Sequence, residues 1–165
     1  MKPEIFFLKY AFPCSFILLL RKEITKEEQE IVYRSVKDGK LHLPKKDIER
    51  IFWRPMKFIK SISDLEAVQK YWRFDHNKHI KEKKFQDFEE KFEKLCMVIP
   101  CEVLDSTEKR AIMRSEFLDG IVELKRDFVD VKPGNKVTKH YDYICEKISE
   151  GLYLKMIESL KKIIE

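Results

Sequence analysis

Glycine and proline are scarce in this sequence, with four and six residues among 165. Their scarcity excludes collagen-like chains and flexible linkers. Hydrophobic residues make up 44% of the chain and charged residues 38%, which argues against disorder and low complexity. A chain of this length buries about 70% of the surface that its unfolded form exposes, so it can fold without disulfides. The composition therefore predicts one compact domain or two small ones.

Cysteine is also rare. The four cysteines are too widely spaced for a small secreted disulfide framework, and the closest pair does not have the spacing of a zinc knuckle; they are Cys14, Cys96, Cys101 and Cys145. This usage favours a reducing compartment, and we expect a cytoplasmic protein.

No hydrophobic run is both long and uninterrupted. The apolar stretch from Phe6 to Leu20 contains Lys9 and Pro13, and it is followed by two basic residues instead of a small-residue cleavage site. It is also shorter than the ~20 residues that a membrane-spanning helix needs. We therefore expect a buried helix here, and no membrane partner.

Neither sign of charge dominates. Lys and Arg number 34 against 29 Asp and Glu, which gives a net charge of +5 with the two signs interleaved. This bias is well short of a nucleic-acid-binding tail. The sequence contains no recognisable nucleophile–base pair, glycine-rich phosphate loop or complete metal-ligand set, so we do not expect an enzyme.

The pattern of apolar residues changes near residue 95. Upstream they repeat at helical spacing, and downstream short β-branched runs alternate with turn residues. The sequence therefore predicts an α+β protein with an all-α domain over residues 1–94 and a second domain over residues 95–165. That domain should contain a small β-barrel and a final helix that begins after Ser149. Its later strands are expected at Ala111–Met113, Gly120–Leu124, Lys136–Lys139 and Tyr143–Ile148.

Several helix boundaries are readable in the first domain. Thr25 with Glu28, and Ser63 with Glu66, have the spacing of a capping box, and Gly39 is placed to end the helix that Thr25 begins.

Two histidines fall on the apolar side of the helix expected after Ser63. His76 and His79 could be half of a metal site or a pH-sensitive docking face, or they could lie at the half-buried end of a packing helix. Residues 81–94 then predict an amphipathic helix with an aromatic seam.

Two segments of the second domain carry a family resemblance. The first is Cys96-Met97-Val98-Ile99-Pro100-Cys101-Glu102-Val103, and the second runs from Val131 through Pro133-Gly134 to His140-Tyr141-Asp142-Tyr143 and Ile148. Their order and spacing resemble the HypC/HupF (HybG) family of [NiFe]-hydrogenase assembly chaperones. Members open with Cys-aliphatic-Ala-Ile-Pro-Gly-x-Val and end with Val-His-x-Gly-Phe-Ala-Ile-x-Lys-Ile followed by an acidic helix. The resemblance covers about residues 95–165.

The resemblance implies a fold and a function. Family members are small OB-like barrels that hold the Fe(CN)2CO unit together with a HypD-type protein and deliver it to the hydrogenase large-subunit precursor. On this basis Cys96 and His140 would bind the iron unit, since low-spin ferrous iron with cyanide and carbon monoxide favours a thiolate ligand. The partner-binding residues implied are Cys96, Met97, Ile99, Pro100, His140 and Tyr143.

The sequence departs from the family pattern at defined positions. In the family the cysteine follows the initiator methionine, whereas Cys96 is internal. Cys101 replaces the glycine after Ile-Pro, and Tyr141-Asp142-Tyr143 replaces x-Gly-Phe. Cys101 and Cys145 could add thiolates near Cys96 or form a redox pair, but we favour small buried side chains.

Three function classes follow from the sequence. The first is a maturation chaperone or adaptor whose helical domain adds selectivity for a client. The second is a degenerate HypC-like interaction module that does not bind iron. The third and weakest is an OB-type nucleic-acid-binding protein, because OB-type barrels often bind nucleic acids and the chain is slightly basic.

Overall fold

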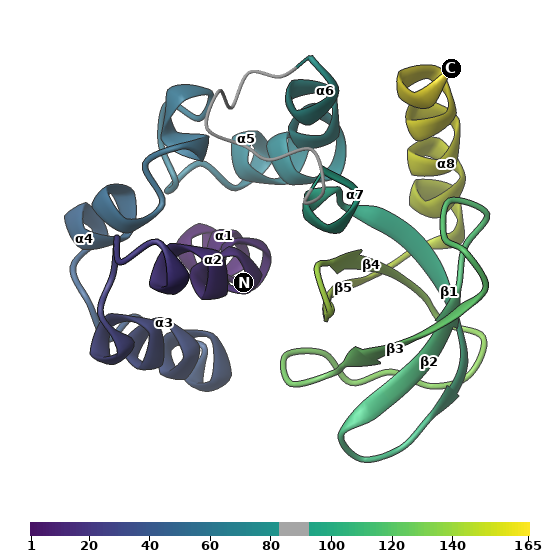
Figure 1. Cartoon of the computed structure of the whole chain (residues 1–165), viewed down its shortest axis with the longest axis horizontal. Coiled ribbons are helices and arrows are strands. Elements are labelled where there is room, and N and C mark those ends of the chain that lie inside the picture. The colour runs from purple at the N-terminus through teal and green to yellow at the C-terminus, as the bar shows by residue number, and fades with distance from the viewer. Residues whose placement is uncertain (83–92) are drawn as a thin grey trace. The chain divides into compact units, whose positions relative to one another are not determined.

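The structure is a computed structural model that describes residues 1–82 and 93–165 (Figure 1). The chain forms two compact units, Met1–Asp75 and His76–Glu165. The second unit thus begins earlier than residue 95, because the helix after Asp75 packs against helices of the second unit. Most of the amphipathic helix expected over residues 81–94, including its aromatic seam, lies outside the described residues.

The N-terminal unit is entirely helical. Its elements are α1 (Pro3–Ala11), η1 (Phe12–Cys14), α2 (Ser15–Leu20), α3 (Lys26–Asp38), α4 (Lys45–Ile51), η2 (Pro55–Lys57), α5 (Leu65–Lys70) and the π-helical η3 (Tyr71–Asp75).

The ends of α3 are those that the sequence predicts. Thr25 and Glu28 form the reciprocal capping box, with a Thr25 Oγ1 to Glu28 N distance of 3.1 Å. Gly39 ends the helix in the left-handed region at φ 65°, where a residue without a Cβ is favoured.

The second predicted capping box is wrong. Asp64, not Ser63, caps α5, with its carboxylate accepting from the backbone N–H of Ala67. The hydroxyl of Ser63 instead donates to Glu4 at 2.8 Å.

Aromatic side chains fill the core of this unit. The rings of Tyr10 and Trp72 stack with centroids 5.5 Å apart, and Phe7 packs against Trp72 at 5.6 Å. All three side chains are at most 1% exposed. The stretch Pro3–Leu20 that supplies two of them is long and apolar enough to cross a membrane by length and composition, and 56% of it is buried inside the structure.

The second unit contains the predicted barrel and C-terminal helix. Its strands are β1 (Ile99–Ser106), β2 (Arg110–Arg114), β3 (Ile121–Lys125), β4 (Lys136–His140) and β5 (Tyr143–Ile148). They close in the order β1-β2-β3-β5-β4, with β4 returning to pair antiparallel with β1 and β3 parallel to β5. This closed five-stranded barrel is the OB-like fold class expected from the sequence.

Buried and exposed residues alternate along β2, and the buried ones contribute to the barrel core. In β2, Ala111 and Met113 are buried between exposed neighbours. Across the closing pair, Cys101 of β1 lies opposite Val137 of β4, and neither is exposed. The turn before β4 needs Gly134, whose φ of 91° suits glycine.

The described part of this unit, residues 76–82 and 93–165, also contains the helices α6 (His76–Lys81), α7 (Glu93–Cys96) and α8 (Glu150–Ile164). Ser149 caps α8, as predicted, by accepting from Leu152 N at 3.1 Å. The helix α8 packs on β1, β4 and α6.

An ion pair network crosses the outside of the closing strands. Glu102 of β1 accepts from Lys136 of β4 and, at 3.0 Å, from Arg114 of β2. The hydrogen bond from Lys136 holds the pKa of the Glu102 carboxyl below its ordinary value, with burial acting the other way. One carboxylate therefore links three neighbouring strands.

We expect Glu102→Gln to lower the free energy of unfolding by about 0.5–1 kcal/mol near pH 7, since the group is partly solvated. A carboxyl with a lowered folded-state pKa stabilises the fold above its unfolded pKa of about 4.3 and loses that effect as pH falls through the folded value. Urea unfolding from ~pH 7 toward ~pH 2 should thus show the difference from wild type shrinking. Glu158→Gln, which breaks an exposed pair with Lys162, is the control. An unchanged difference at the acid end would contradict the assignment.

Candidate functional site

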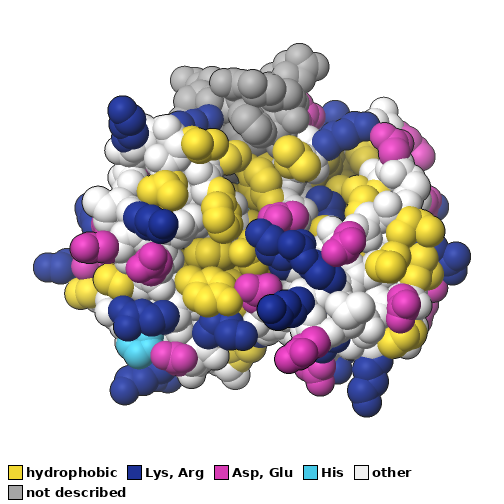
Figure 2. All heavy atoms as spheres, turned by 60° about the horizontal axis from the view of Figure 1, so that its bottom comes forward, with side chains coloured by type: hydrophobic (Ala, Val, Ile, Leu, Met, Phe, Trp, Pro, Cys, Tyr) yellow, Lys and Arg dark blue, Asp and Glu magenta, His cyan; other side chains and the backbone are white. Residues whose placement is uncertain are grey.

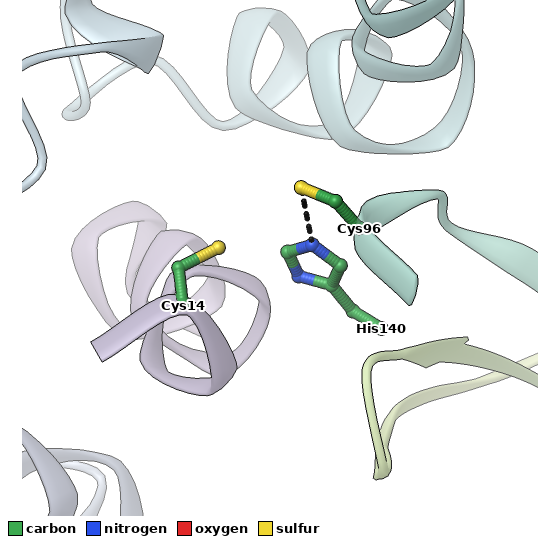
Figure 3. A group of neighbouring side chains, drawn as sticks. All are labelled: Cys14, Cys96 and His140. Atoms are coloured by element: carbon green, nitrogen blue, oxygen red, sulfur yellow. Dashed lines mark hydrogen bonds between the residues drawn. The ribbon is translucent and has the colours of Figure 1, made fainter. Parts of the chain in front are cut away.

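The two residues that the family resemblance selects lie together in the second unit. The sulfur of Cys96 is 3.6 Å from Nε2 of His140, although the residues are 44 positions apart. Figure 3 shows the thiol pointing toward the imidazole ring; Cys14, also drawn there, belongs to the N-terminal unit. Cys96 is 5% exposed and His140 is fully buried. Cys96 is the last residue of α7, and β1 begins three residues later at Ile99.

Barrel closure positions His140. It is the last residue of β4 and pairs with Tyr143 across a two-residue connection. The first residue of that connection, Tyr141, has φ 52°, the left-handed conformation that such tight hairpins favour. Its backbone N–H donates to the carbonyl of Leu95 at 2.9 Å. Because Leu95 precedes Cys96 and Tyr141 follows His140, this bond draws the two side chains together.

A second histidine contacts the cysteine from α6. His76 Nε2 lies 2.9 Å from the carbonyl oxygen of Cys96 and 3.7 Å from its sulfur. A carbonyl can only accept, so Nε2 of His76 carries the proton and donates. That nitrogen is therefore not a metal ligand while the bond holds, and His76 acts as a positioning residue. One interpretation of the sequence places both histidines at the half-buried end of a packing helix. His79 is half-buried, as that interpretation predicts, but His76 is only 3% exposed.

Asn77 fixes the chain on the other side of Cys96. Its side-chain amide accepts from the N–H of Val98 and donates to the carbonyl of the same residue, both at 2.7 Å. The Asn77 amide and the N–H and C=O of Val98 are buried, so each would lack a hydrogen-bond partner without this contact. The two paired bonds resemble those of a β-ladder. His76 and Asn77 together hold the segment between α7 and β1.

The spacing of the sulfur and the imidazole nitrogen fits a shared metal. A first-row metal ion bound to both would lie about 2.3 Å from sulfur and about 2.0–2.1 Å from nitrogen, which separates the two ligand atoms by roughly 3.1–3.6 Å. The observed 3.6 Å falls at the upper end of that range. A thiolate with an imidazole is a donor set that suits soft, electron-rich iron better than carboxylates would.

The other predicted partner-binding residues are buried. Met97 is 5% exposed, Ile99 3% and Tyr143 4%, and Pro100 is buried within β1. The ring of Tyr143 stacks on Phe128 with centroids 5.4 Å apart. Their role toward a partner stays a prediction.

Cys101 and Cys145 are the small buried side chains that we favoured. Neither is exposed, and their thiols point to the backbone carbonyls of Ile99 and Tyr143. Burial raises the pKa of the Cys101 thiol to about 12, with Lys139 acting slightly the other way. Cys101 therefore stays a protonated thiol at neutral pH and is unsuited to redox or metal chemistry.

Sequence reasoning missed the part that α6 plays. His76 stood out only as a polar residue on an apolar stripe, and Asn77 carried no signal. The π-helical turn η3, which immediately precedes them, is a feature often found beside functional residues, but it is not visible in the residue pattern.

Comparison with known proteins finds no matching family model and no matching curated protein. The resemblance to the HypC family therefore depends on the residues quoted for it.

We expect Asn77→Ala to lower the free energy of unfolding by about 2–4 kcal/mol, because it leaves a buried N–H and a buried C=O without their partner. The matched control is Asn135→Ala, which removes one exposed hydrogen bond to Lys132 N and should cost about 0.5–1 kcal/mol. Chemical denaturation of the full chain measures both. Equal losses would mean that the Asn77 contact does not hold this segment.

Proposed function

We propose that this chain is a cytoplasmic hydrogenase-maturation chaperone or adaptor of the HypC type. Its second unit would bind a HypD-type protein or the hydrogenase large-subunit precursor, with Fe(CN)2CO as transient cargo on Cys96 and His140. The helical unit would add selectivity for a client. The role needs binding and delivery, and no catalysis by the chain itself.

One observation carries this proposal. A thiol and an imidazole nitrogen, 44 positions apart, converge to 3.6 Å on an OB-like barrel, and they are the two residues that the family resemblance selects. The backbone bond from Tyr141 to Leu95 and the contacts from α6 support the convergence. One departure from the family pattern, Cys101, directs its thiol to the carbonyl of Ile99.

Charge distribution gives little support to the nucleic-acid alternative. On the face drawn in Figure 2, basic and acidic side chains are interspersed. On the barrel, Lys136 and Arg114 both pair with Glu102, and Lys125 pairs with Asp142. Cations already paired with carboxylates gain less from phosphates, so a groove for a nucleic-acid backbone is not favoured.

The test is anaerobic co-purification of the tagged full chain with a HypD-type partner, followed by infrared spectroscopy. We expect cyanide and carbonyl stretches of a metal-bound unit in the wild type, and their loss in Cys96→Ala and in His140→Ala. Cys145→Ala, a buried cysteine of the same barrel outside the site, is the control and should keep the bands.

A stable complex without bands would favour an interaction module that does not bind iron. Absence of both the complex and the bands would overturn the family function. Bands that persist in Cys96→Ala would remove the cysteine from the site.

His76 generates a separate prediction, because it holds the carbonyl of Cys96. We expect His76→Ala to weaken retention of the iron unit by about tenfold while the chain stays folded, as for other residues that orient metal ligands. His76→Gln keeps an N–H donor and should restore most of the retention of the iron unit. Infrared band intensity per protein after dialysis measures retention, and equal loss in both variants would contradict a positioning role.

A further inference from the structure

One end of the barrel carries a hollow of about 420 Å³. We call it the Lys139 hollow; its lining residues are Leu95, Leu118, Val122, Leu124, Lys139, Tyr141 and Asp142. They come from α7, the β2–β3 connection, β3, the end of β4 and the turn after it. The walls are mostly aliphatic, and the volume is within the range of small-ligand sites.

A lysine lies where the barrel pattern calls for an apolar residue. Lys139 pairs with Ile99 on one side and Ile144 on the other, and it shares its strand face with Val137, a core residue. The side chain is only 4% exposed. The sequence thus places an ammonium group among inward-facing hydrophobic residues, which is costly unless the charge has partners.

The hydrogen-bonding capacity of this ammonium is only partly used. It donates to the carbonyl of Tyr141 at 3.0 Å, and an ammonium has three donors. Among residues 1–82 and 93–165, no carboxylate forms an ion pair with it. Asp142, the carboxylate that lines the same hollow, pairs instead with Lys125 at 3.2 Å.

A ligand that fits these features has a hydrocarbon body and an anionic end. We propose that the Lys139 hollow binds an apolar carboxylate, whose hydrocarbon part packs on Leu95, Val122 and Leu124 while its carboxylate accepts from the Lys139 ammonium. A free alkanoate and the C-terminal residue of a polypeptide share this chemistry. The binding requires no iron at Cys96.

The Lys139 hollow adjoins the Cys96–His140 pair along the chain. Leu95 precedes Cys96, and Lys139 and Tyr141 flank His140, so three of the lining residues are direct chain neighbours of the thiol–imidazole pair. The carbonyl that accepts from Lys139 belongs to the residue whose N–H holds Leu95. A carboxylate bound to Lys139 therefore acts on the same backbone connection that brings Cys96 to His140.

Isothermal titration of the full chain with matched probes tests the proposal. The probes are hexanoate and hexanamide, and N-acetyl-leucyl-leucine with a free or an amidated C-terminus. We expect at least one acid to bind in the millimolar range or tighter, and about tenfold more tightly than its amide, because a charge-assisted hydrogen bond is lost in the amide. Tighter binding of the dipeptide acid would identify a polypeptide C-terminus as the source, and tighter binding of hexanoate a free alkanoate.

Lys139→Met keeps most of the length of the side chain and removes the charge. It should abolish the preference for acid over amide and raise the melting temperature, since an apolar residue suits the site better. Lys147→Met, the same change at an exposed position of β5, is the control and should leave binding unchanged. Val122→Phe fills the hollow and should weaken acid and amide alike.

Equal affinity for acid and amide, or acid binding that survives Lys139→Met, would overturn the proposal. So would the absence of binding by every probe.

Discussion

Closure of the barrel through β1 and β4 is the constraint on which the site depends. The antiparallel pairing sets Ile99 opposite Lys139, and so brings the start of β1 beside the end of β4. Cys96 lies three residues before Ile99, and His140 follows Lys139, so the pairing that closes the barrel also brings the thiol to the imidazole. If β4 slipped by one residue, His140 would point to the opposite face and the site would be lost.

Much of the barrel could be predicted from sequence because turn chemistry is local. Pro133-Gly134 and the alternating residues after it predicted β4 and β5 within one residue, and Ser149 predicted the start of α8. The failed capping box shows the limit of such signals. Ser63 and Asp64 are both good cap residues, and the tertiary bond from Ser63 to Glu4 decides between them.

The site was only partly predictable, because its contacts join distant segments. The family resemblance selected Cys96 and His140, but the short distance between their side chains does not follow from composition or from spacing along the sequence. The contacts of His76 and Asn77 arise where α6 packs beside α7 and α8 within the second unit, and no local sequence pattern encodes that packing. Lys139 was invisible for a different reason: a period-two pattern assigns charged residues to the solvent side, and this lysine lies on the buried side.

The burial of Cys96 affects how fast a ligand can reach its thiol. A cysteine at a free N-terminus meets its partners at the rate of diffusion, whereas a thiol 5% exposed, with His76 on its carbonyl, is reached only when the surrounding segment opens. If Cys96 binds the proposed iron unit, the residence time of that unit would depend on the opening rate of the protein as well as on bond strength. An internal, buried cysteine would then exchange its ligand more slowly than a cysteine at a free N-terminus.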